Sequence, residues 1–550
     1  MRARGHGGAE NCAETQESGR SITLFCAIVE EVVGSHHTNR MIAPAPVRLS
    51  KSKFVAGVQC LKRLYYQIYE PELAGQPDES QQARLQQGNE VGLLAQSRFP
   101  GGVFVGFEHG SDGALAQTAC LLDDSSVPAI FEATFQHQGV LVRVDILQRR
   151  PASRWRLLEV KSSVDVKEYH LYDVAIQAHV LRGCGLDLSS CCLMHLNRDY
   201  VYDGRRYDPA GLFAIRNLTG QIRKLDAEVP KLLRSQRKAL ALEHPPEIAP
   251  GRHCSEPVAC EFYACCNAPV PDHHISFLPR LSDKTQAELL GQGITLIHEI
   301  PEGFSLTENQ IRVWTSVKTG HPWVSDTLAR ELSRLKYPLY FMDFETLYPA
   351  IPRFDGMWPY SHIPFQWSIH RQMSVDSELE HFEFLAEDEE DPRRAFLDSL
   401  SEALGKRGLT VVYNAGFESQ RLSDLAKWMP EHAGKIARIQ ARLWDLWPFV
   451  KKHVYHPQFQ GSFSLKAVLP ALVPGYSYEG MEVSHGGEAG LAWDQMVRGN
   501  LDLEERRRLK AALLVYCRQD TLAMAKILEV LRTGKLRAPG ACGPNPRRDG

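Results

Sequence analysis

Two carboxylates interrupt the apolar stretch Leu339-Tyr-Phe-Met-Asp-Phe-Glu-Thr346, one at Asp343 and the other at Glu345. The side chains of a strand alternate between its two faces, so both carboxylates project from the same face. Two acids on one face of a buried strand repel each other and lose hydration unless a cation lies between them. Mg²⁺ and Mn²⁺ prefer carboxylate oxygens, so the stretch predicts a site for one of these ions. The alternative interpretation is an edge strand with two solvated acids.

The length and composition of the chain limit its organisation. With 550 residues the chain is too long for one hydrophobic core and suggests about three domains. Its 66 acidic and 63 basic residues give a net charge of −3, so any surface for nucleic acid has to be local. No apolar segment is long enough to cross a bilayer, and no export signal is evident. We therefore predict a cytoplasmic protein without a membrane partner, whose 13 cysteines are reduced thiols and metal ligands.

Both ends of the chain lack the periodicity of folded segments. Residues 1–46 are rich in Gly, Glu, His and Arg, and residues 535–550 are rich in Gly, Pro and Arg. We predict a disordered tail at each end. Met1 and Met41 stay open as alternative initiation sites, because Met41 directly precedes the first recognisable domain.

The segment 47–270 combines helical and strand patterns. A helix start at Ser50 is followed by an amphipathic helix over Val58–Tyr66, which carries Cys60. The remaining patterns predict helices over Gln81–Phe99 and Lys167–Arg182, and strands over Val140–Leu147, Trp155–Ser162 and Ser190–Asn197. The first two of these strands are joined by a turn at Arg150-Pro151 and form a hairpin.

Four polar residues of this segment form a second candidate site. Asp145 lies in the middle of the first hairpin strand, and Glu159 and Lys161 share one face of the second. One acid from each strand can hold a divalent metal, while Lys161 orients or polarises the attacking water. The helix that follows offers Gln177. The alternative is a surface hairpin with an incidental Glu–Lys pair.

The order Asp145, Glu159-x-Lys161, Gln177 resembles the PD-(D/E)XK nuclease superfamily, in particular its RecB-like exonucleases. The resemblance implies a restriction-endonuclease-like α/β domain with Asp145 and Glu159 as metal ligands. Two features depart from that family. Relatives often have His where this chain has Gly92, next to Glu90, and they usually have Tyr where it has Leu181. The departures affect accessory positions and leave the metal ligands in place.

Cysteines bracket the same segment. Five residues separate Cys254 from Cys260 and Cys260 from Cys266, and Cys60 lies far upstream. RecB-like nucleases of the helicase–nuclease and CRISPR-associated kinds have one early and three late cysteines, and this resemblance implies a [4Fe–4S] cluster. Tetrahedral Zn²⁺ and ordinary buried thiols are the alternatives, and Cys265 competes with Cys266 for the last ligand position. Three further cysteines are interpreted as core residues: Cys184, Cys191 and Cys192.

Residues 271–335 are predicted to be a helical linker. Short helical patterns alternate with Gly-bearing turns such as the one at Gly293. This arrangement is typical of a helix-hairpin-helix-like module, whose backbone amides bind phosphate oxygens. A helical spacer is the alternative, and Lys318–Lys336 is expected to be further connecting helix.

The segment 336–534 is the third predicted domain and begins with the stretch quoted first. Further strands are expected over Phe365–Met373, His381–Leu385 and Leu409–Asn414, and helices over Arg393–Leu404, from Glu418 onward, and over Leu465–Leu472 and Leu503–Leu531. On the last helix Tyr516 and Asp520 are one turn apart and share a face.

Asp343-x-Glu345, Glu418 after an Asn-x-x-Phe pattern, and Tyr516-x-x-x-Asp520 resemble the DnaQ-like exonucleases of the DEDD class. The resemblance implies an RNase H-like mixed-sheet domain. It also implies two Mg²⁺ or Mn²⁺ ions held by four carboxylates at the scissile phosphate, with Tyr516 positioning the attacking water. Glu418 replaces the usual Asp, and its extra methylene moves the carboxylate outward.

Two other polar residues of this domain are weaker candidates. Asp445 is either a further acid near the site or the cap of a helix or strand terminus. Lys466 is either a phosphate contact or a solvated lysine at the start of a helix.

The order of the two domains resembles a bacterial and archaeal family of predicted RecB-like nucleases with a C-terminal exonuclease-type domain, over Val47 to Leu531. The resemblance implies metal-dependent hydrolysis of DNA or RNA in nucleic-acid processing or repair. It suggests exonucleolytic action on single-stranded DNA ends, beside a helicase partner. The alternative is a nucleic-acid-binding protein with a structural iron–sulfur cluster and one or both nuclease sites inactive.

Overall fold

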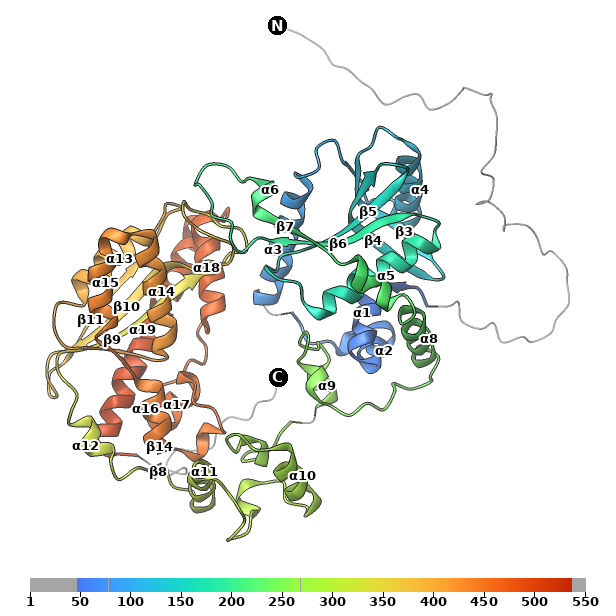
Figure 1. Ribbon diagram of the computed structural model, residues 1–550. Coiled ribbons are helices and arrows are strands. Elements are labelled where there is room, and N and C mark those ends of the chain that lie inside the picture. Colours follow the sequence, from blue (N-terminus) through green and yellow to red (C-terminus); the bar gives the residue numbers. More distant parts are fainter. Residues whose placement is uncertain (1–46, 78, 268, 537–550) are drawn as a thin grey trace, which may run out of the picture. The chain divides into compact units, whose positions relative to one another are not determined.

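The computed structural model describes residues 47–77, 79–267 and 269–536 (Figure 1). The tail predicted over residues 1–46, the alternative start at Met41 and nearly all of the tail predicted over 535–550 lie outside these residues. The described chain is an α/β protein with two mixed sheets and many helices, which confirms the predicted class at this level. Among the described residues, no helix combines the length and the apolar character that crossing a bilayer requires.

The first sheet has seven strands and contains the predicted hairpin. Its strand order is β2-β3-β4-β5-β6-β7, and β1 pairs with β4 in parallel. The hairpin strands β4 and β5 are antiparallel, and both lie inside the sheet because β3 and β6 pair with their other edges. The strands are β1 (Leu49–Ser50), β2 (Val103–Phe104), β3 (Ala129–His137), β4 (Val140–Arg150), β5 (Arg154–Lys161), β6 (Leu188–Leu196) and β7 (Phe213–Asn217).

Nine helices of the described residues accompany this sheet. The predicted single helix around Cys60 is wrong: Cys60 has extended backbone (φ −160°, ψ 123°) and separates α1 from α2. It ends the first helix and begins the second, and its thiol lies beside the late cysteines. The helices are α1 (Lys51–Gln59), α2 (Leu61–Tyr69), α3 (Glu79–Gln96), α4 (Gly110–Asp123), α5 (Glu168–Gly183), α6 (Pro209–Leu212), α7 (Thr219–Leu225), α8 (Val229–Leu240) and α9 (Tyr263–Cys266).

The second sheet places the quoted stretch at its centre. Strand β9 (Leu339–Leu347) lies between antiparallel β10 and parallel β12, so the alternative of an edge strand is wrong. The strand order is β11-β10-β9-β12-β13. The other strands are β10 (Ile363–Gln372), β11 (Leu379–Leu385), β12 (Leu409–Val412) and β13 (Leu443–Asp445).

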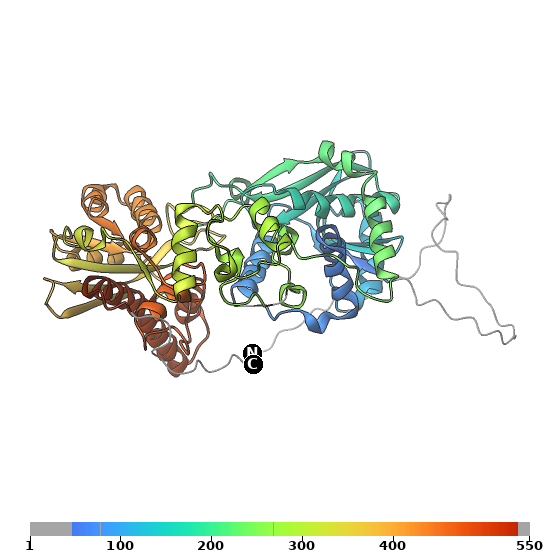
Figure 2. The same cartoon turned by 90° about the horizontal axis from the view of Figure 1, so that it is seen from below.

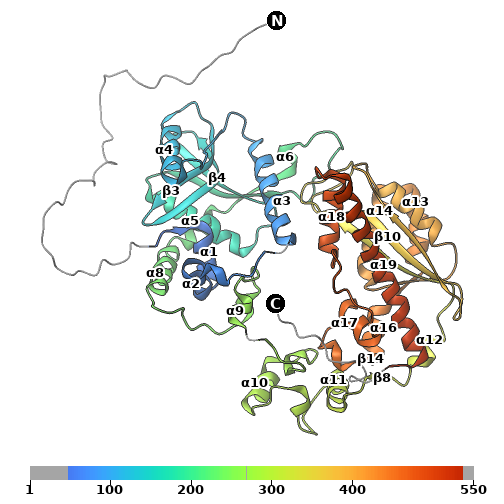
Figure 3. The ribbon, with the colours of Figure 1, turned by 180° about the vertical axis from the view of Figure 1, so that it is seen from behind.

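The two faces of β9 pack against different sets of helices. Tyr340, Met342 and Phe344 join a core with the helices that follow β11 and β12, whereas Phe341 and Leu347 join a core with the C-terminal helices. Figure 2 shows the yellow strands between the orange helices and the dark red α19, and Figure 3 shows α19 crossing the strands. The helices are α13 (Arg393–Ala403), α14 (Ala415–Trp428), α15 (Ala433–Gln440), α16 (Leu446–His453), α17 (Leu465–Leu472), α18 (Gly486–Arg498) and α19 (Leu503–Thr533).

The segment predicted as a linker contains α10 (Asp283–Gly291), α11 (Glu308–Thr319), β8 (Trp323–Val324) and α12 (Leu328–Leu332). The continuous helix expected over Lys318–Lys336 is wrong. Gly320 adopts left-handed backbone (φ 69°) and ends α11, and β8 then pairs with β14 (Val454–Tyr455). Apolar side chains of this segment share the core that contains Phe341.

Candidate functional sites

The C-terminal candidate residues come together around strand β9 of the second sheet. Strand β9 carries Asp343 and Glu345, α14 brings Glu418 in its first turn, and α19 brings Tyr516 and Asp520. Asp520, Glu345 and Glu418 all act electrostatically on Asp343, so the four carboxylates form one group, which we call the C-terminal centre. Glu345, Glu418, Tyr516 and Asp520 are buried, and Asp343 is partly exposed.

Burial and mutual repulsion dominate the electrostatics of the C-terminal centre. They raise the pKa of Asp343 well above its usual value and that of Glu345 to about 8. Burial also raises the pKa of Glu418 to about 8 and that of Asp520 to about 6. Within the described part of the chain, none of these carboxylates forms an ion pair within 4.0 Å. Asp343 and Glu345 place carboxylate oxygens within 4.8 Å of each other, and Glu418 Oε2 is buried without a hydrogen-bond partner, so these donors suit a divalent cation.

Three further residues lie beside this centre. Cys517 and Tyr478 were not predicted as site residues, and Lys466 was only a weak candidate. The Cys517 thiol lies with carboxylate oxygens of Asp343 and Glu345 in a group whose atoms are all within 4.8 Å of one another. Tyr478 donates a hydrogen bond of 2.5 Å to Asp520 Oδ1. Lys466 Nζ lies 5.7 Å from the ring centroid of Tyr478, and its charge lowers the pKa of Glu345 and Asp520. Lys466 therefore faces the centre.

Asp445 positions the helix that carries Glu418. Its carboxylate accepts hydrogen bonds from the backbone N–H groups of Asn414 (3.0 Å), Ala415 (2.9 Å) and Trp447 (3.0 Å). It therefore caps the start of α14 and of α16. Of the two interpretations left open for Asp445, these contacts support the helix cap.

The N-terminal candidate residues also come together, from β4, β5 and α5. Gln177 Nε2 donates to Glu159 Oε2 at 2.6 Å, and Lys161 Nζ lies 2.9 Å from Glu159 Oε1. Asp145 Oδ2 accepts from the Val160 N–H at 2.6 Å. Glu159 is 1% exposed, so the alternative of a surface hairpin is wrong. We call this group the N-terminal centre.

Two residues of the N-terminal centre were missed. Lys51, the first residue of α1, places its Nζ 2.9 Å from both oxygens of Glu159 and 3.7 Å from Asp145 Oδ1. Asp173 on α5 pairs with Lys161 at 2.7 Å. Lys51 has no local sequence signal, because tertiary packing alone brings α1 to the hairpin. Asp173 lies one helical turn before Gln177 on α5, and that spacing could have indicated it.

The charges in the N-terminal centre largely balance. Although burial opposes ionisation, Lys51 and Lys161 hold the pKa of Glu159 far below its usual value. Burial and the charge of Glu159 raise the pKa of Asp145 to about 7. The accessory positions contribute little here, since Leu181 is fully buried in the core and Glu90 is exposed on α3. The two centres thus differ: lysines neutralise the first, whereas the second holds excess acid.

The four predicted cysteines line one small hollow. Cys60 meets Cys254, Cys260 and Cys266 there, while Cys265 is exposed and is not part of the lining. All four are free thiols. In the described chain, every set of three of these cysteines contains at least one pair of sulfur atoms more than 4.8 Å apart. A tetrahedral Zn²⁺ with Zn–S bonds of about 2.3 Å needs sulfur atoms roughly 3.8 Å apart. The four thiols of the described chain therefore do not stand at the spacing of a formed Zn²⁺ site.

Comparisons with known proteins add little to this geometry. A family model described as a domain of unknown function (DUF2779) matches residues 340–464, which include Asp343, Glu345 and Glu418 but end before Asp520. No curated protein matches the chain. Among solved structures, the chain is similar to one titled "Crystal structure of SSO0001" at 15% identity, over 34% of this chain and 78% of that one, with a TM-score of 0.16. A likeness at this TM-score carries no argument about fold or function.

The raised pKa of Glu345 makes the stability of the metal-free protein depend on pH. The folded state holds this proton more tightly than the unfolded state, so the stabilisation is complete below about pH 4.5 and is lost as the pH rises through about 8. Glu345→Gln removes the charge, and we expect its thermal midpoint in EDTA to exceed that of the wild type at pH 8.5. The difference should shrink toward pH 5.

The matched control is Glu288→Gln, which alters an exposed acid on α10. It should leave the thermal midpoint unchanged across the same pH range. A Glu345→Gln midpoint equal to or below that of the wild type at pH 8.5 would contradict the charge crowding described for this centre.

Proposed function

We propose that the protein is a metal-dependent nuclease that hydrolyses phosphodiester bonds of DNA or RNA. The observation that carries the proposal is the C-terminal centre: four clustered carboxylates, three of them buried, with no ion pair in the described chain. Unpaired buried acids are costly, and bound divalent cations would relieve that cost. In this proposal the second sheet is an RNase H-like domain of the DEDD exonuclease class.

Different side chains of the C-terminal centre would bind the metal ions and orient the attacking water. Asp343, Glu345, Glu418 and Asp520 would hold Mg²⁺ or Mn²⁺, which supply Lewis-acid activation of water and charge stabilisation at the phosphate. Tyr516, one turn before Asp520, would orient the attacking water by hydrogen bonding. The substrate would be a single-stranded end, cleaved by direct attack of water without a covalent enzyme intermediate.

The first sheet would form a second, PD-(D/E)XK-type centre. Asp145 and Glu159 would hold one or two divalent ions, and Lys161 would orient the attacking water. Gln177 fixes the Glu159 carboxylate through its 2.6 Å hydrogen bond. We propose that the protein acts in nucleic-acid processing or repair in the cytoplasm, beside a helicase.

The cysteines would hold a [4Fe–4S] cluster rather than Zn²⁺. Four thiols that line one hollow suit the four ligand positions of such a cluster. Such a cluster would link the junction of α1 and α2 to the segment Cys254–Cys266, and would thereby close a very long loop of the chain.

A second candidate function follows from Lys51. Its ammonium group contacts both carboxylates of the N-terminal centre and already supplies a positive charge there. In this alternative only the C-terminal centre is catalytic, and the first domain binds nucleic acid.

Paired variants test the proposal. Asp343→Ala should reduce cleavage of labelled single-stranded DNA or RNA at the C-terminal centre by at least about 100-fold, because a metal-binding carboxylate contributes several kcal/mol. If the N-terminal centre is active, adding Asp145→Ala to the Asp343→Ala variant should abolish the cleavage that remains. The exposed Asp326→Ala serves as the control. Cleavage unaffected by either variant in Mg²⁺ and Mn²⁺ would favour a binding protein.

Lys51→Met separates the two candidate functions when the C-terminal centre is disabled by Asp343→Ala. If the N-terminal centre takes up a metal ion, the ion competes with the Lys51 ammonium group. The variant should then reach half-maximal cleavage at a lower Mn²⁺ concentration. Absence of cleavage both with and without Lys51 would leave only the C-terminal centre as an enzyme.

Cys60→Ala tests the proposed cluster. Protein purified without oxygen should show a broad visible absorption band and about four iron atoms per chain, and the variant should lose both. Cys120→Ala, which alters an exposed thiol on α4, should retain them. Stoichiometric zinc without iron in the wild type would replace the iron–sulfur interpretation.

A further inference from the structure

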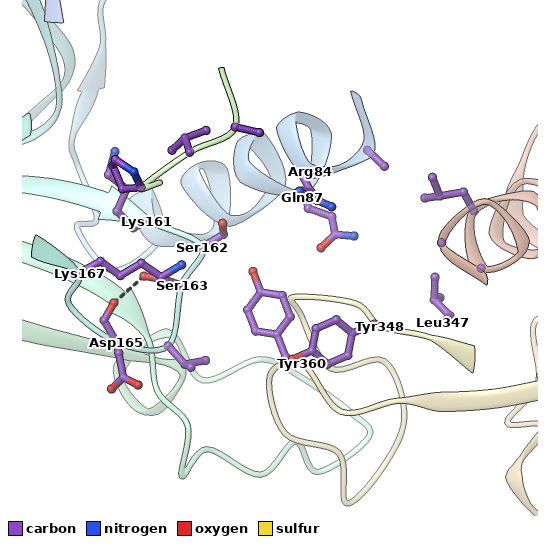
Figure 4. A pocket seen from close by; sticks show the side chains of 18 of the residues that line it. Arg84, Gln87, Lys161, Ser162, Ser163, Asp165, Lys167, Leu347, Tyr348 and Tyr360 are labelled. Atoms are coloured by element: carbon purple, nitrogen blue, oxygen red, sulfur yellow. Dashed lines mark hydrogen bonds between the residues drawn. The ribbon is translucent and has the colours of Figure 1, made fainter. Parts of the chain in front are cut away.

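A cavity of about 850 Å³ borders residues of both centres (Figure 4). At one end its lining includes Lys161, which pairs with Glu159 of the N-terminal centre. At the other end it includes Thr346, which directly follows Glu345, and Gly486, where an added Cβ would lie 3.1 Å from Glu345 Oε2. The cavity therefore extends from one carboxylate centre toward the other.

Aromatic side chains form the middle of this cavity. The Tyr348 ring lies 4.3 Å from that of His362 in a stacked arrangement and 5.0 Å from that of Tyr360. Tyr348 is nevertheless 48% exposed, so much of its ring remains available to a ligand. Exposed aromatic rings are stacking platforms for the bases of single-stranded nucleic acid, and every base has a π-face.

The aromatic platform is held in place from both sides. Tyr360 has a backbone φ of 61°, which bulky residues rarely adopt, and its N–H donates to the Pro349 carbonyl at 3.0 Å. Ser162, the residue after Lys161, lines the same cavity as Tyr360. Gln87 of α3 accepts from the Ala350 N–H at 3.2 Å. Such contacts keep the platform ordered before any ligand binds.

Basic side chains lie beside the rings. Arg84 and Lys167 line the cavity and are exposed, and within the described chain neither pairs with a carboxylate. Asp165, the one acid in the lining, pairs with Arg198. The cavity thus offers unpaired positive charge for a backbone of phosphates and aromatic surface for bases. Helices α3 and α18 lie side by side at this cavity (Figure 1, Figure 3).

We propose that one single strand of nucleic acid lies in this cavity with a base stacked on Tyr348, and that this strand reaches both carboxylate centres. The inference rests on the proposed nuclease function and makes it more specific, because a single strand is then shared by two hydrolytic centres. DNA and RNA both present the phosphates and bases that this surface would recognise.

Binding in EDTA tests the stacking platform without any cleavage. Fluorescence anisotropy with labelled oligothymidylate should show that Tyr348→Ala weakens binding roughly 5- to 150-fold, since one stacked base contributes about 1–3 kcal/mol. Tyr348→Phe keeps the ring and should bind within about twofold of the wild type. Phe104→Ala, which removes an exposed ring on β2, should not change the affinity. The same series with oligouridylate shows which nucleic acid is preferred.

Crosslinking tests whether one strand spans the cavity. In the Asp145→Asn, Asp343→Asn double variant, a photoreactive base is moved stepwise along one oligonucleotide. The crosslinked peptide should shift from the Lys161–Lys167 region to Tyr348 and then to the start of α18. Crosslinks confined to one end would overturn the shared strand.

The two proposals fail in different ways. If the wild type cleaves nucleic acid but Tyr348→Ala binds and cleaves as well as the wild type, the cavity inference is wrong and the nuclease function stands. If the wild type cleaves no DNA or RNA yet loses binding in Tyr348→Ala, the nuclease function is wrong and the binding site stands.

Discussion

Repulsion among buried carboxylates is the constraint on which the C-terminal half of this protein depends. A central strand can carry Asp343 and Glu345 only if something else in the fold accepts their charge. The two helices that cross this region add further acid through Glu418 and Asp520 instead of supplying a matching cation. Burial and repulsion then keep these groups partly protonated near neutral pH. Under the proposed function, a divalent ion from solution would complete this site.

The N-terminal centre also contains buried carboxylates, but their negative charge is compensated in another way. Lys51 and Lys161 both contact Glu159, so the chain itself supplies the compensating charge. A buried ion pair of this sort is stable without a metal, but an entering cation has to compete with it. The two centres therefore differ in how much positive charge the chain places beside their carboxylates, although their residue types are similar. This difference is a property of tertiary packing and does not follow from either motif.

Periodic signals in the sequence predicted much of this architecture. The central strand, the helix over Leu465–Leu472 and the pairing of Tyr516 with Asp520 on one long helix were recovered because strand alternation and helical turns leave local patterns. Lys51 and Tyr478 were not predicted as site residues, because distant packing brings each of these single residues to its centre. The break at Cys60 was missed for a related reason, since neither Gly nor Pro marks it and its thiol faces cysteines almost 200 residues away.

Helix α1 lies between the cysteine hollow and the N-terminal centre. Lys51 is its first residue, and Cys60 follows its last residue directly. A helix of nine residues is about 13.5 Å long. The cysteine hollow and the N-terminal centre are therefore joined by a single short helix, with Cys60 after its last residue and the ammonium group of Lys51 at its first.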